Sequence, residues 1–293
     1  SAATAAPTIN PRELEINLTA EPPRQHRLPP MYGMNPRCRH AFREWIQEHL
    51  ALGTIALTRE RPAMTTPHFV KEESRPDGTR KFRILGDFKA LNAITQAIPD
   101  TTPHVAAIRS WTTSFKYIGK IDLKNAFYNV PVAQSSRKYL AFVFEGRCYQ
   151  YLRMPMGITN GPAQFAAYLH DLAKSCDVPP AHLRIYQDDL FVGGDTIEER
   201  DRHMTRVTEW CKANQLRLNP LKTQRSETGV DILGVHVKNG MTNIPPERIQ
   251  QLSRVATLIA NAETTTKRQL SKLASTAQFY LPFHPAIPTL LTP

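Results

Sequence analysis

The sequence predicts an α+β fold, because antiparallel hairpins and amphipathic helices lie in separate stretches of the chain. Apolar runs flank tight-turn residues at several places, which is typical of β-hairpins. Apolar residues also recur at the spacing of one helix face in longer stretches. The 293 residues are enough for a large core and more than one subdomain. The expected hairpins cover residues 67–88, 140–152 and 183–194, and helices are expected to begin near residues 36, 161, 197, 246 and 266.

Residues 1–30 are rich in proline, alanine and polar residues, and include the pair Pro22-Pro23. This composition predicts an extended N-terminal lead-in that wraps the surface or is partly disordered. The segment Ser1–Pro7 lacks the charged and apolar regions of a signal peptide. No uninterrupted apolar run is long enough for a transmembrane helix. Secretion and membrane insertion are therefore not expected.

The first helix is predicted to start at Pro36, with Asn35 as its N-cap, and to end at Gly53. A hairpin with basic residues on its returning strand is expected next, around the turn residues 76–79.

A second hairpin turns at Glu145-Gly146. Asn160 is predicted to cap the following helix, and residues 196–199 form a capping box that opens another. Residues 216–219 are expected to form a short strand.

The formal net charge is +11 and the sequence pI is about 9.6. Such a charge is typical of a protein whose partner is a polyanion, although solubility alone would also account for it. The four cysteines form no CxxC pair, and no histidine cluster has the spacing of a zinc site. We expect scattered thiols in a reducing compartment.

Adjacent carboxylates lie in the sequence Tyr186-Gln187-Asp188-Asp189, between apolar runs that predict a hairpin. Neighbouring carboxylates repel each other and are favourable where divalent cations supply the counter-charge. A solvated turn is the alternative for such a pair taken alone. A further strand, residues 117–122, ends at Asp122 and is followed by an aromatic pair. Together these carboxylates are a set that can hold two magnesium ions for in-line phosphoryl transfer.

Five ordered motifs resemble those of the reverse transcriptases of retroviruses and LTR retrotransposons, in particular the gypsy-like elements. The resemblance covers roughly residues 28 to 290. The matching residues, in chain order, are Asp87–Asn92, Asp122–Phe127, Met154–Phe165, Tyr186–Asp189 and Ile232–Gly234.

The resemblance implies a right-hand polymerase fold with fingers, an antiparallel-sheet palm and a helical thumb. The fingers are expected at residues 31–96 and 130–158, the palm at 97–129 and 159–240, and the thumb at 241–293. The thumb segment has few acidic residues, so no RNase H domain, which needs clustered carboxylates around metal, is expected within this chain.

The same resemblance implies catalytic roles. Asp122 and Asp188 are expected to be the main ligands of two Mg²⁺ ions, with Asp189 assisting and Mn²⁺ as a possible substitute. Lys222 falls where the family has a lysine that protonates the leaving pyrophosphate; the alternative is an exposed loop lysine.

For the incoming nucleotide, Arg83 falls at a triphosphate-contacting position, and Lys71 is the weaker candidate for its partner. Phe127 is expected to stack beneath the deoxyribose as a steric gate, with a core aromatic as the alternative. Met156 stands where many retroviral relatives have glutamine, near the nucleotide sugar and base, and Leu123 belongs to the same expected set.

For primer and template, Leu233 and Gly234 resemble the primer grip, and Tyr186 belongs to the same expected set. The phosphate backbone is expected to rest on basic thumb residues. These are Arg254, Lys267, Arg268 and Lys272.

The function implied is an RNA-directed and DNA-directed DNA polymerase that adds dNTPs to a primer 3′-hydroxyl on an RNA or DNA template. Its expected location is cytoplasmic, in a virus-like particle, or nuclear. The competing hypothesis is a catalytically retired relative that only binds nucleic acid or protein. A third possibility, an enzyme that uses a carboxylate triad on another substrate, leaves the basic thumb unexplained.

Overall fold

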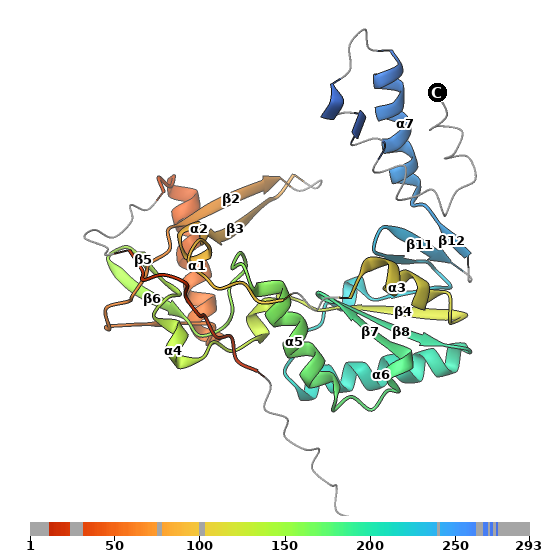
Figure 1. Ribbon diagram of the computed structural model, residues 1–293, viewed down its shortest axis with the longest axis horizontal. Coiled ribbons are helices and arrows are strands. Elements are labelled where there is room, and N and C mark those ends of the chain that lie inside the picture. Colours follow the sequence, from red (N-terminus) through yellow and green to blue (C-terminus); the bar gives the residue numbers. More distant parts are fainter. Residues whose placement is uncertain are drawn as a thin grey trace, which may run out of the picture.

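The structure is a computed structural model, and it describes residues 12–23, 32–74, 78–99, 103–238, 241–261, 266–268, 270–271 and 274. Separate helices and antiparallel sheets confirm the predicted α+β class. Figure 1 shows the sheets β1-β6-β5 and β2-β3 on one side of α5, and the sheet of β4, β7 and β8 on the other, with α7 above.

On the first side lie the elements expected to form the fingers. They are α1 (Pro36–Ala51), β1 (Ile55–Leu57), β2 (His68–Ser74), β3 (Arg80–Gly86), α2 (Lys89–Asn92), α4 (Gln134–Arg137), β5 (Ala141–Phe144) and β6 (Arg147–Tyr151).

On the other side lie the elements of the expected palm, with 3₁₀ turns denoted η. They are α3 (Val105–Thr112), β4 (Tyr117–Asp122), η1 (Ala126–Asn129), α5 (Gly161–Ala173), η2 (Pro180–His182), β7 (Leu183–Tyr186), β8 (Asp189–Gly194), α6 (Ile197–Ala213), η3 (Pro220–Lys222), β9 (Gln224–Arg225), β10 (Val230–Ile232), β11 (Val235–Lys238) and β12 (Met241–Asn243). Helix α7 (Pro246–Ala260) follows.

Helix α1 begins as the sequence predicts, because the Asn35 side chain accepts a hydrogen bond from Cys38 N at 2.8 Å. Its buried face carries Phe42, whose ring packs 4.4 Å from that of Phe144 and 6.0 Å from that of Phe142. The helix is thereby fixed against strand β5, so the local capping signal and the core contact specify the same element.

The hairpin between β5 and β6 turns at Glu145-Gly146, and both residues have positive φ angles, +49° and +74°. Positive φ at both central residues is the geometry of a type I′ turn, whose twist matches that of the flanking strands. The predicted hairpin is therefore confirmed. In the hairpin of β2 and β3, the register places Lys71 opposite Arg83.

The sheet that carries the carboxylates has the strand order β7-β8-β4-β9 and is antiparallel throughout. Helix α6 lies along one face of it (Figure 1). A Cβ at Gly119 of β4 would collide with the sulfur of Met204, so the Met204 side chain packs here at the closest approach that glycine allows. Arg200 of α6 is fully buried and donates to both carboxylate oxygens of Glu227 at 2.6 Å each. These contacts hold the helix beneath the sheet.

Strands β10, β11 and β12 form a further antiparallel sheet. Because β12 pairs with β11, residues 241–243 belong to this sheet, and α7 begins at Pro246. Helix α7 confirms the first helix expected after that point. Most of the second expected helix, residues 266–280, lies outside the described residues.

The described part of the lead-in is packed more tightly than the sequence suggests. Leu14 and Ile16 are buried, and Leu14 N donates to Pro131 O at 2.7 Å. Residues 1–11 and 24–31 lie outside the described residues. Alternating apolar residues in the segment 12–18 were a signal for this burial, but proline and alanine content dominated the prediction.

Asn160 stands at the N-cap position of α5, as predicted, but its side chain makes no capping hydrogen bond. Its side chain instead accepts from Ile98 N at 3.2 Å and donates to Gln96 O at 2.8 Å. The nonlocal segment 96–98 thus competes successfully for the amide group. None of the helices in the described ranges combines the length and apolar character needed to cross a bilayer.

Candidate active site

The antiparallel register of β4 and β8 places Asp122 directly opposite Asp189. Opposed residues of an antiparallel pair project from the same face of a sheet, so the two carboxylates share one side. Asp188 lies in the tight turn between β7 and β8 and is exposed, whereas Asp122 is buried. Gln187 takes the left-handed conformation that this short turn requires, with φ +52°.

Backbone hydrogen bonds hold the carboxylate-bearing segments together. Leu123 N donates to Asp188 O at 2.8 Å, and Asn219 N donates to Asp122 O at 2.9 Å. The first bond ties the end of β4 to the β7–β8 turn, and the second ties it to the segment that leads to η3. The arrangement of the aspartates therefore rests on backbone contacts between three separate parts of the chain.

Two lysines form ion pairs with two of these aspartates. Lys222 Nζ lies 3.3 Å from Asp122 Oδ2, and Lys120 Nζ lies 2.8 Å from Asp189 Oδ2. Burial raises the pKa of Asp189, Lys120 opposes this shift, and the negative charges of Asp188 and Asp122 add to it. Lys222 is thus a neighbour of the carboxylates as well as an exposed residue, with 62% of its side chain accessible.

Sequence reasoning missed Lys120. It lies two residues before Asp122, so strand alternation places both side chains on the same face of β4. A lysine within an otherwise apolar strand, at that spacing from the aspartate, was the available signal.

Carboxylate oxygens at adjoining strand ends are the donor set that suits Mg²⁺. Among the described residues, however, the carboxylate oxygens of the three aspartates do not all lie within 4.8 Å of one another. Here the ammonium groups of Lys120 and Lys222 supply part of the counter-charge that metal ions would supply. The three aspartates fit a magnesium site in charge and in ligand type. Their side chains would have to move closer together to bind one ion jointly.

On the β2–β3 hairpin, Lys71 and Arg83 both contact Glu73. Lys71 Nζ lies 3.1 Å from one carboxylate oxygen and Arg83 Nε lies 2.9 Å from the other. The Lys71 side chain is 60% exposed and that of Arg83 is 48% exposed. Both cations are therefore accessible to an anion that displaces Glu73.

The loop with Met156 is held by Asn92, the last residue of the motif Asp87–Asn92. Asn92 donates to Gly157 O at 2.9 Å and accepts from Thr159 N at 2.8 Å. Gly157 has φ +95°, a conformation that favours glycine. Met156 is 48% exposed at the tip of this loop. Two motifs that are distant in sequence thus form one structural unit.

Phe127 lies in η1, directly after the strand that ends at Asp122. Its ring is half-buried and packs against Phe165 of α5, with 5.2 Å between ring centroids. A Cβ at Gly161 would lie 3.5 Å from the Phe127 ring, so α5 supports the ring closely at this point. The ring therefore has a core contact and an accessible part.

Leu123 differs from the other expected nucleotide-binding residues. Its side chain is only 2% exposed and its backbone N–H is bonded to Asp188 O. Burial removes this side chain from contact with a nucleotide, so the structure supports a role in positioning Asp188 instead. Tyr186 is half-buried at the base of the β7–β8 turn and packs against a cluster of buried residues that includes Ile118 and Phe191.

The β10–β11 turn contains Leu233 and Gly234, with φ angles of +48° and +88°. A left-handed conformation is uncommon for leucine and needs support from its surroundings. Arg109 of α3 provides it by donating from Nη2 to Leu233 O at 2.5 Å. Sequence reasoning missed Arg109, because nothing near it in the chain points to this turn.

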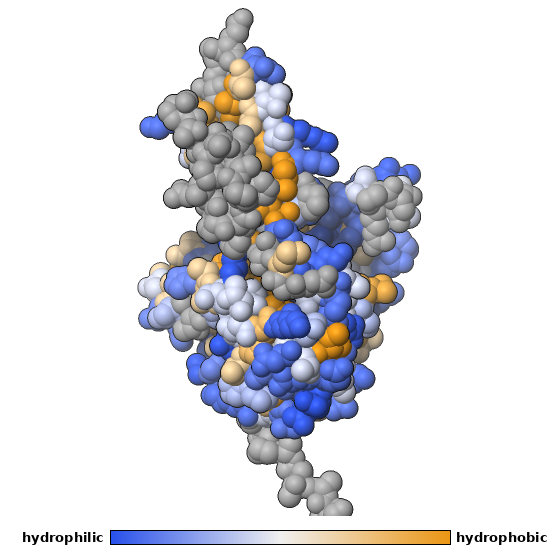
Figure 2. All heavy atoms as spheres, turned by 90° about the vertical axis from the view of Figure 1, so that its right-hand side faces the viewer, coloured by the Kyte–Doolittle hydropathy of each residue, from blue (hydrophilic) through white to orange (hydrophobic). Residues whose placement is uncertain are grey.

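Only some of the basic residues expected in the thumb lie within the described part of the chain. Arg254 on α7, Lys267 and Arg268 are exposed, and Lys272 lies outside the described residues. Helix α7 also carries exposed apolar residues, Ile249 and Leu258. Figure 2 shows hydrophobic atoms along this upper part of the molecule, above a largely hydrophilic surface.

Comparison with solved structures shows the fold. The foamy viral protease–reverse transcriptase in complex with double-stranded DNA matches with a TM-score of 0.70 at 23% identity, covering 95% of this chain and 56% of that chain. The same protein in complex with an RNA/DNA hybrid matches with a TM-score of 0.66 at 22% identity, covering 93% of this chain and 36% of that chain. The right-hand polymerase fold expected from the motifs is thus confirmed.

Curated relatives are longer polyproteins. The chain is 26% identical over 224 residues to a putative enzymatic polyprotein of Cassava vein mosaic virus, covering 75% of this chain and 34% of the relative. It is 26% identical over 263 residues to the Pro-Pol polyprotein of Simian foamy virus type 1, covering 86% of this chain and 22% of the relative. The chain spans about a third or less of the length of these relatives.

The family model described as reverse transcriptase (RNA-dependent DNA polymerase) matches residues 70–237. This match includes the three aspartates, both neighbouring lysines and the β10–β11 turn. The chain belongs to the reverse transcriptase family.

Proposed function

We propose that this chain is an active DNA polymerase of a retroelement that uses RNA and DNA templates and adds dNTPs to a primer 3′-hydroxyl. The observation that carries the proposal is the cross-strand pair Asp122 and Asp189, with Asp188 in the adjoining turn and a lysine against each member of the pair. A scaffold that only binds nucleic acid has no need of such clustered charges at buried strand ends.

Asp122, Asp188 and Asp189 would hold two Mg²⁺ ions, with Mn²⁺ as a substitute, and bound metal would supply activation of the primer hydroxyl and stabilisation of charge on the phosphates. The chain's own groups orient the carboxylates. The Leu123 N–H holds the Asp188 segment, and Lys120 holds Asp189. Lys222, beside Asp122, is the proposed proton donor to the leaving pyrophosphate.

For the nucleotide, we assign Lys71 and Arg83 to the triphosphate. In the described structure Glu73 contacts both cations, and a triphosphate carries more negative charge than one carboxylate, so it can displace Glu73. Met156 and the accessible part of the Phe127 ring are assigned to the base and sugar. Phe127 would exclude a 2′-hydroxyl by contact.

The proposed partners are a primer paired with an RNA or DNA template and the incoming dNTPs. Solved relatives are described in complex with double-stranded DNA and with an RNA/DNA hybrid, which supports this choice. The net charge of +11 and the exposed thumb cations suit a phosphate backbone. We place the activity in a virus-like particle or in the nucleus, in keeping with the polyprotein relatives.

Primer extension with dNTPs on RNA and DNA templates tests the proposal. Asp122→Asn and Asp188→Asn should abolish extension while the affinity for primer–template stays within about threefold, because neither change alters the basic surface. Asp195→Asn is the matched control, since this exposed aspartate lies just beyond the far end of β8. Substantial extension by either of the first two variants would refute the assignment of the aspartates as metal ligands. No extension by the unmodified chain would favour the retired-domain hypothesis.

A further inference from the structure

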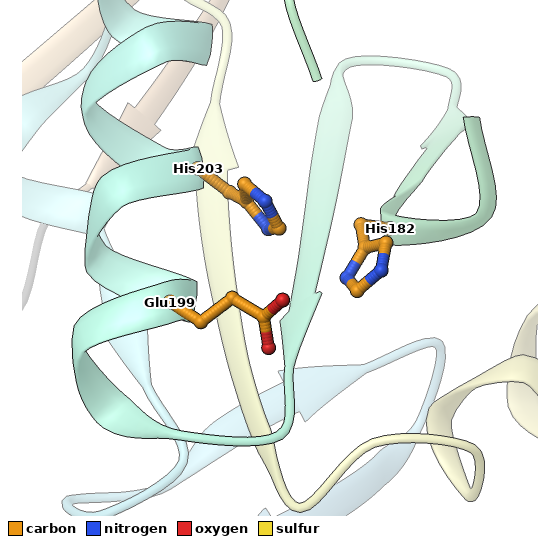
Figure 3. A group of neighbouring side chains, drawn as sticks. All are labelled: His182, Glu199 and His203. Atoms are coloured by element: carbon orange, nitrogen blue, oxygen red, sulfur yellow. The ribbon is translucent and has the colours of Figure 1, made fainter. Parts of the chain in front are cut away.

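A second cluster of polar side chains lies in the palm, away from the aspartates. Figure 3 shows His182 at the end of η2 and Glu199 and His203 on α6, all directed toward one another across strand β8. One potential ligand atom from each lies within 4.8 Å of the others. It is the single such group found among the described residues.

The hydrogen bonds of the two histidines determine where their protons lie. Nδ1 of His182 and Nδ1 of His203 both lie 3.1 Å from Gly193 O. A carbonyl oxygen can only accept, so Nδ1 is the protonated nitrogen of each neutral ring and Nε2 keeps its lone pair. Metal-binding histidines commonly donate their other ring nitrogen to a backbone carbonyl in this way, which fixes the tautomer needed for coordination.

Glu199 is held in its ionised form. Its Oε2 accepts a hydrogen bond from Asp195 N at 2.7 Å, and a hydrogen bond to a carboxylate oxygen favours the charged form. The carboxylate group points toward the histidine rings. Glu199 and His203 are four residues apart on one helix face, so a regular helix presents both to the same point.

The ligand types indicate which ions can bind. Two imidazoles and one carboxylate, with a position left for water, suit zinc and related first-row transition metals. Magnesium prefers oxygen ligands alone, so this set differs in kind from the aspartate set. Ligands at about 2.0–2.1 Å from a tetrahedral zinc are about 3.4 Å apart, so closure from the observed separation needs only small side-chain movements.

We propose that His182, Glu199 and His203 form a zinc-class transition-metal site that the sequence spacing alone did not suggest. The site would join η2 and α6 on either side of Gly193. Gly193 lies four residues along β8 from Asp189, which is about 13 Å of strand, so the proposed site is separate from the carboxylates. The ion would clamp the base of the hairpin that presents Asp188 and Asp189.

The test measures metal binding by the full chain and does not depend on polymerase activity. After chelator treatment, the protein is titrated with Zn²⁺ by calorimetry and with Co²⁺ by visible spectroscopy. We expect one tight equivalent in the unmodified chain and in the Asp122→Asn/Asp188→Asn double variant. Binding by the double variant would show that the proposed site does not depend on the aspartates. Because the proposed ligands are nitrogen and oxygen atoms, the cobalt spectrum should lack thiolate charge-transfer bands.

Variants of the ligands should weaken this binding at least tenfold. His182→Ala changes a half-buried residue at a helix end, and Glu199→Gln keeps an acceptor for Asp195 N, so both should fold; circular dichroism checks this. His40→Ala is the matched control, because His40 and Glu44 also lie four residues apart on a helix, 3.4 Å from each other, with both side chains exposed. Zn²⁺ should raise the thermal midpoint of the unmodified chain and of His40→Ala, but not of His182→Ala.

Three outcomes would overturn the proposal. The first is that the unmodified chain binds no saturable equivalent of Zn²⁺. The second is that His182→Ala and Glu199→Gln bind Zn²⁺ as tightly as the unmodified chain. The third is a cobalt spectrum with thiolate charge-transfer bands, which would assign the metal to cysteines.

Discussion

Lys120 Nζ lies 2.8 Å from Asp189 Oδ2, and the two side chains are only 15% and 17% exposed. The same ammonium group lies 3.5 Å from Asp231 O, at the start of the β10–β11 turn. One lysine therefore links a carboxylate of the proposed catalytic set to the turn that resembles the primer grip. A partly buried ion pair of this kind is sensitive to removal of either member.

Replacing Lys120 should impair the proposed reaction more than substrate binding. Lys120→Met leaves Asp189 partly buried without its counter-charge, a cost of about 1–3 kcal/mol, so we expect kcat for primer extension to fall about tenfold or more. Primer–template affinity should change little. Lys120→Arg should retain much of the activity because it keeps the charge, and Lys116→Met, on an exposed neighbour, should behave like the unmodified chain. Normal kcat in Lys120→Met would refute a positioning role for this lysine.

Reducing Phe127 should relax the choice of sugar. Phe127→Val removes the ring that we place beside the 2′ position, so kcat/KM for ribonucleotides should rise relative to deoxyribonucleotides by about tenfold or more. The measurement compares both sugars with one base on one template. Phe165→Leu is a control for packing alone, since Phe165 supports the Phe127 ring from the core. A proportional loss with both sugars in Phe127→Val would make the ring structural.

Duplex binding should depend steeply on salt. Each phosphate neutralised contributes about −0.9 to the slope of log affinity against log salt concentration for B-form DNA. Changing Arg254, Lys267, Arg268 and Lys272 together to glutamine should make that slope shallower. Arg202, Arg206 and Lys212 are exposed on α6 and provide a control set, whose neutralisation should leave the slope nearly unchanged. If the thumb variant kept the full slope, the duplex would have to lie elsewhere.

Folding stability should decline with acid because of His68. This residue is buried, accepts a hydrogen bond from Tyr151 Oη at Nε2, and donates from Nδ1 to Thr66 O. Burial lowers its pKa from 6.5 to about 4. The unfolded chain therefore takes up a proton below pH 6.5 while the folded chain does so only near pH 4, and about 3 kcal/mol of stability is lost across that interval.

Urea unfolding at pH 7.5 and pH 4.5 measures this loss. His68→Gln can keep both hydrogen bonds without titrating, so its stability should depend less on pH than that of the unmodified chain. His40→Gln, at an exposed position, should retain the full dependence. Parallel pH profiles for His68→Gln and the unmodified chain would show that other groups govern acid lability.

The sequence by itself determined the elements whose causes are local. Asn35 caps α1, Glu145-Gly146 forms the turn of the β5–β6 hairpin, and Tyr186–Asp189 lies around a tight turn, because each depends on residues only a few positions apart. The fold class and the family could be predicted for a related reason. Their signals are short contiguous motifs, each carried by one strand, turn or helix start.

Tertiary structure alone decided the contacts between distant segments. Asn160 stands at the N-cap position of α5, yet its side chain bonds to residues 96–98 instead of the helix, because a nonlocal backbone segment competes for its amide. Arg109 reaches Leu233 across 124 positions, and His182 meets His203 through the carbonyl of Gly193. Such pairs have no fixed spacing in sequence. Only the antiparallel register of the palm strands and the packing of α3 and α6 against them bring these groups together.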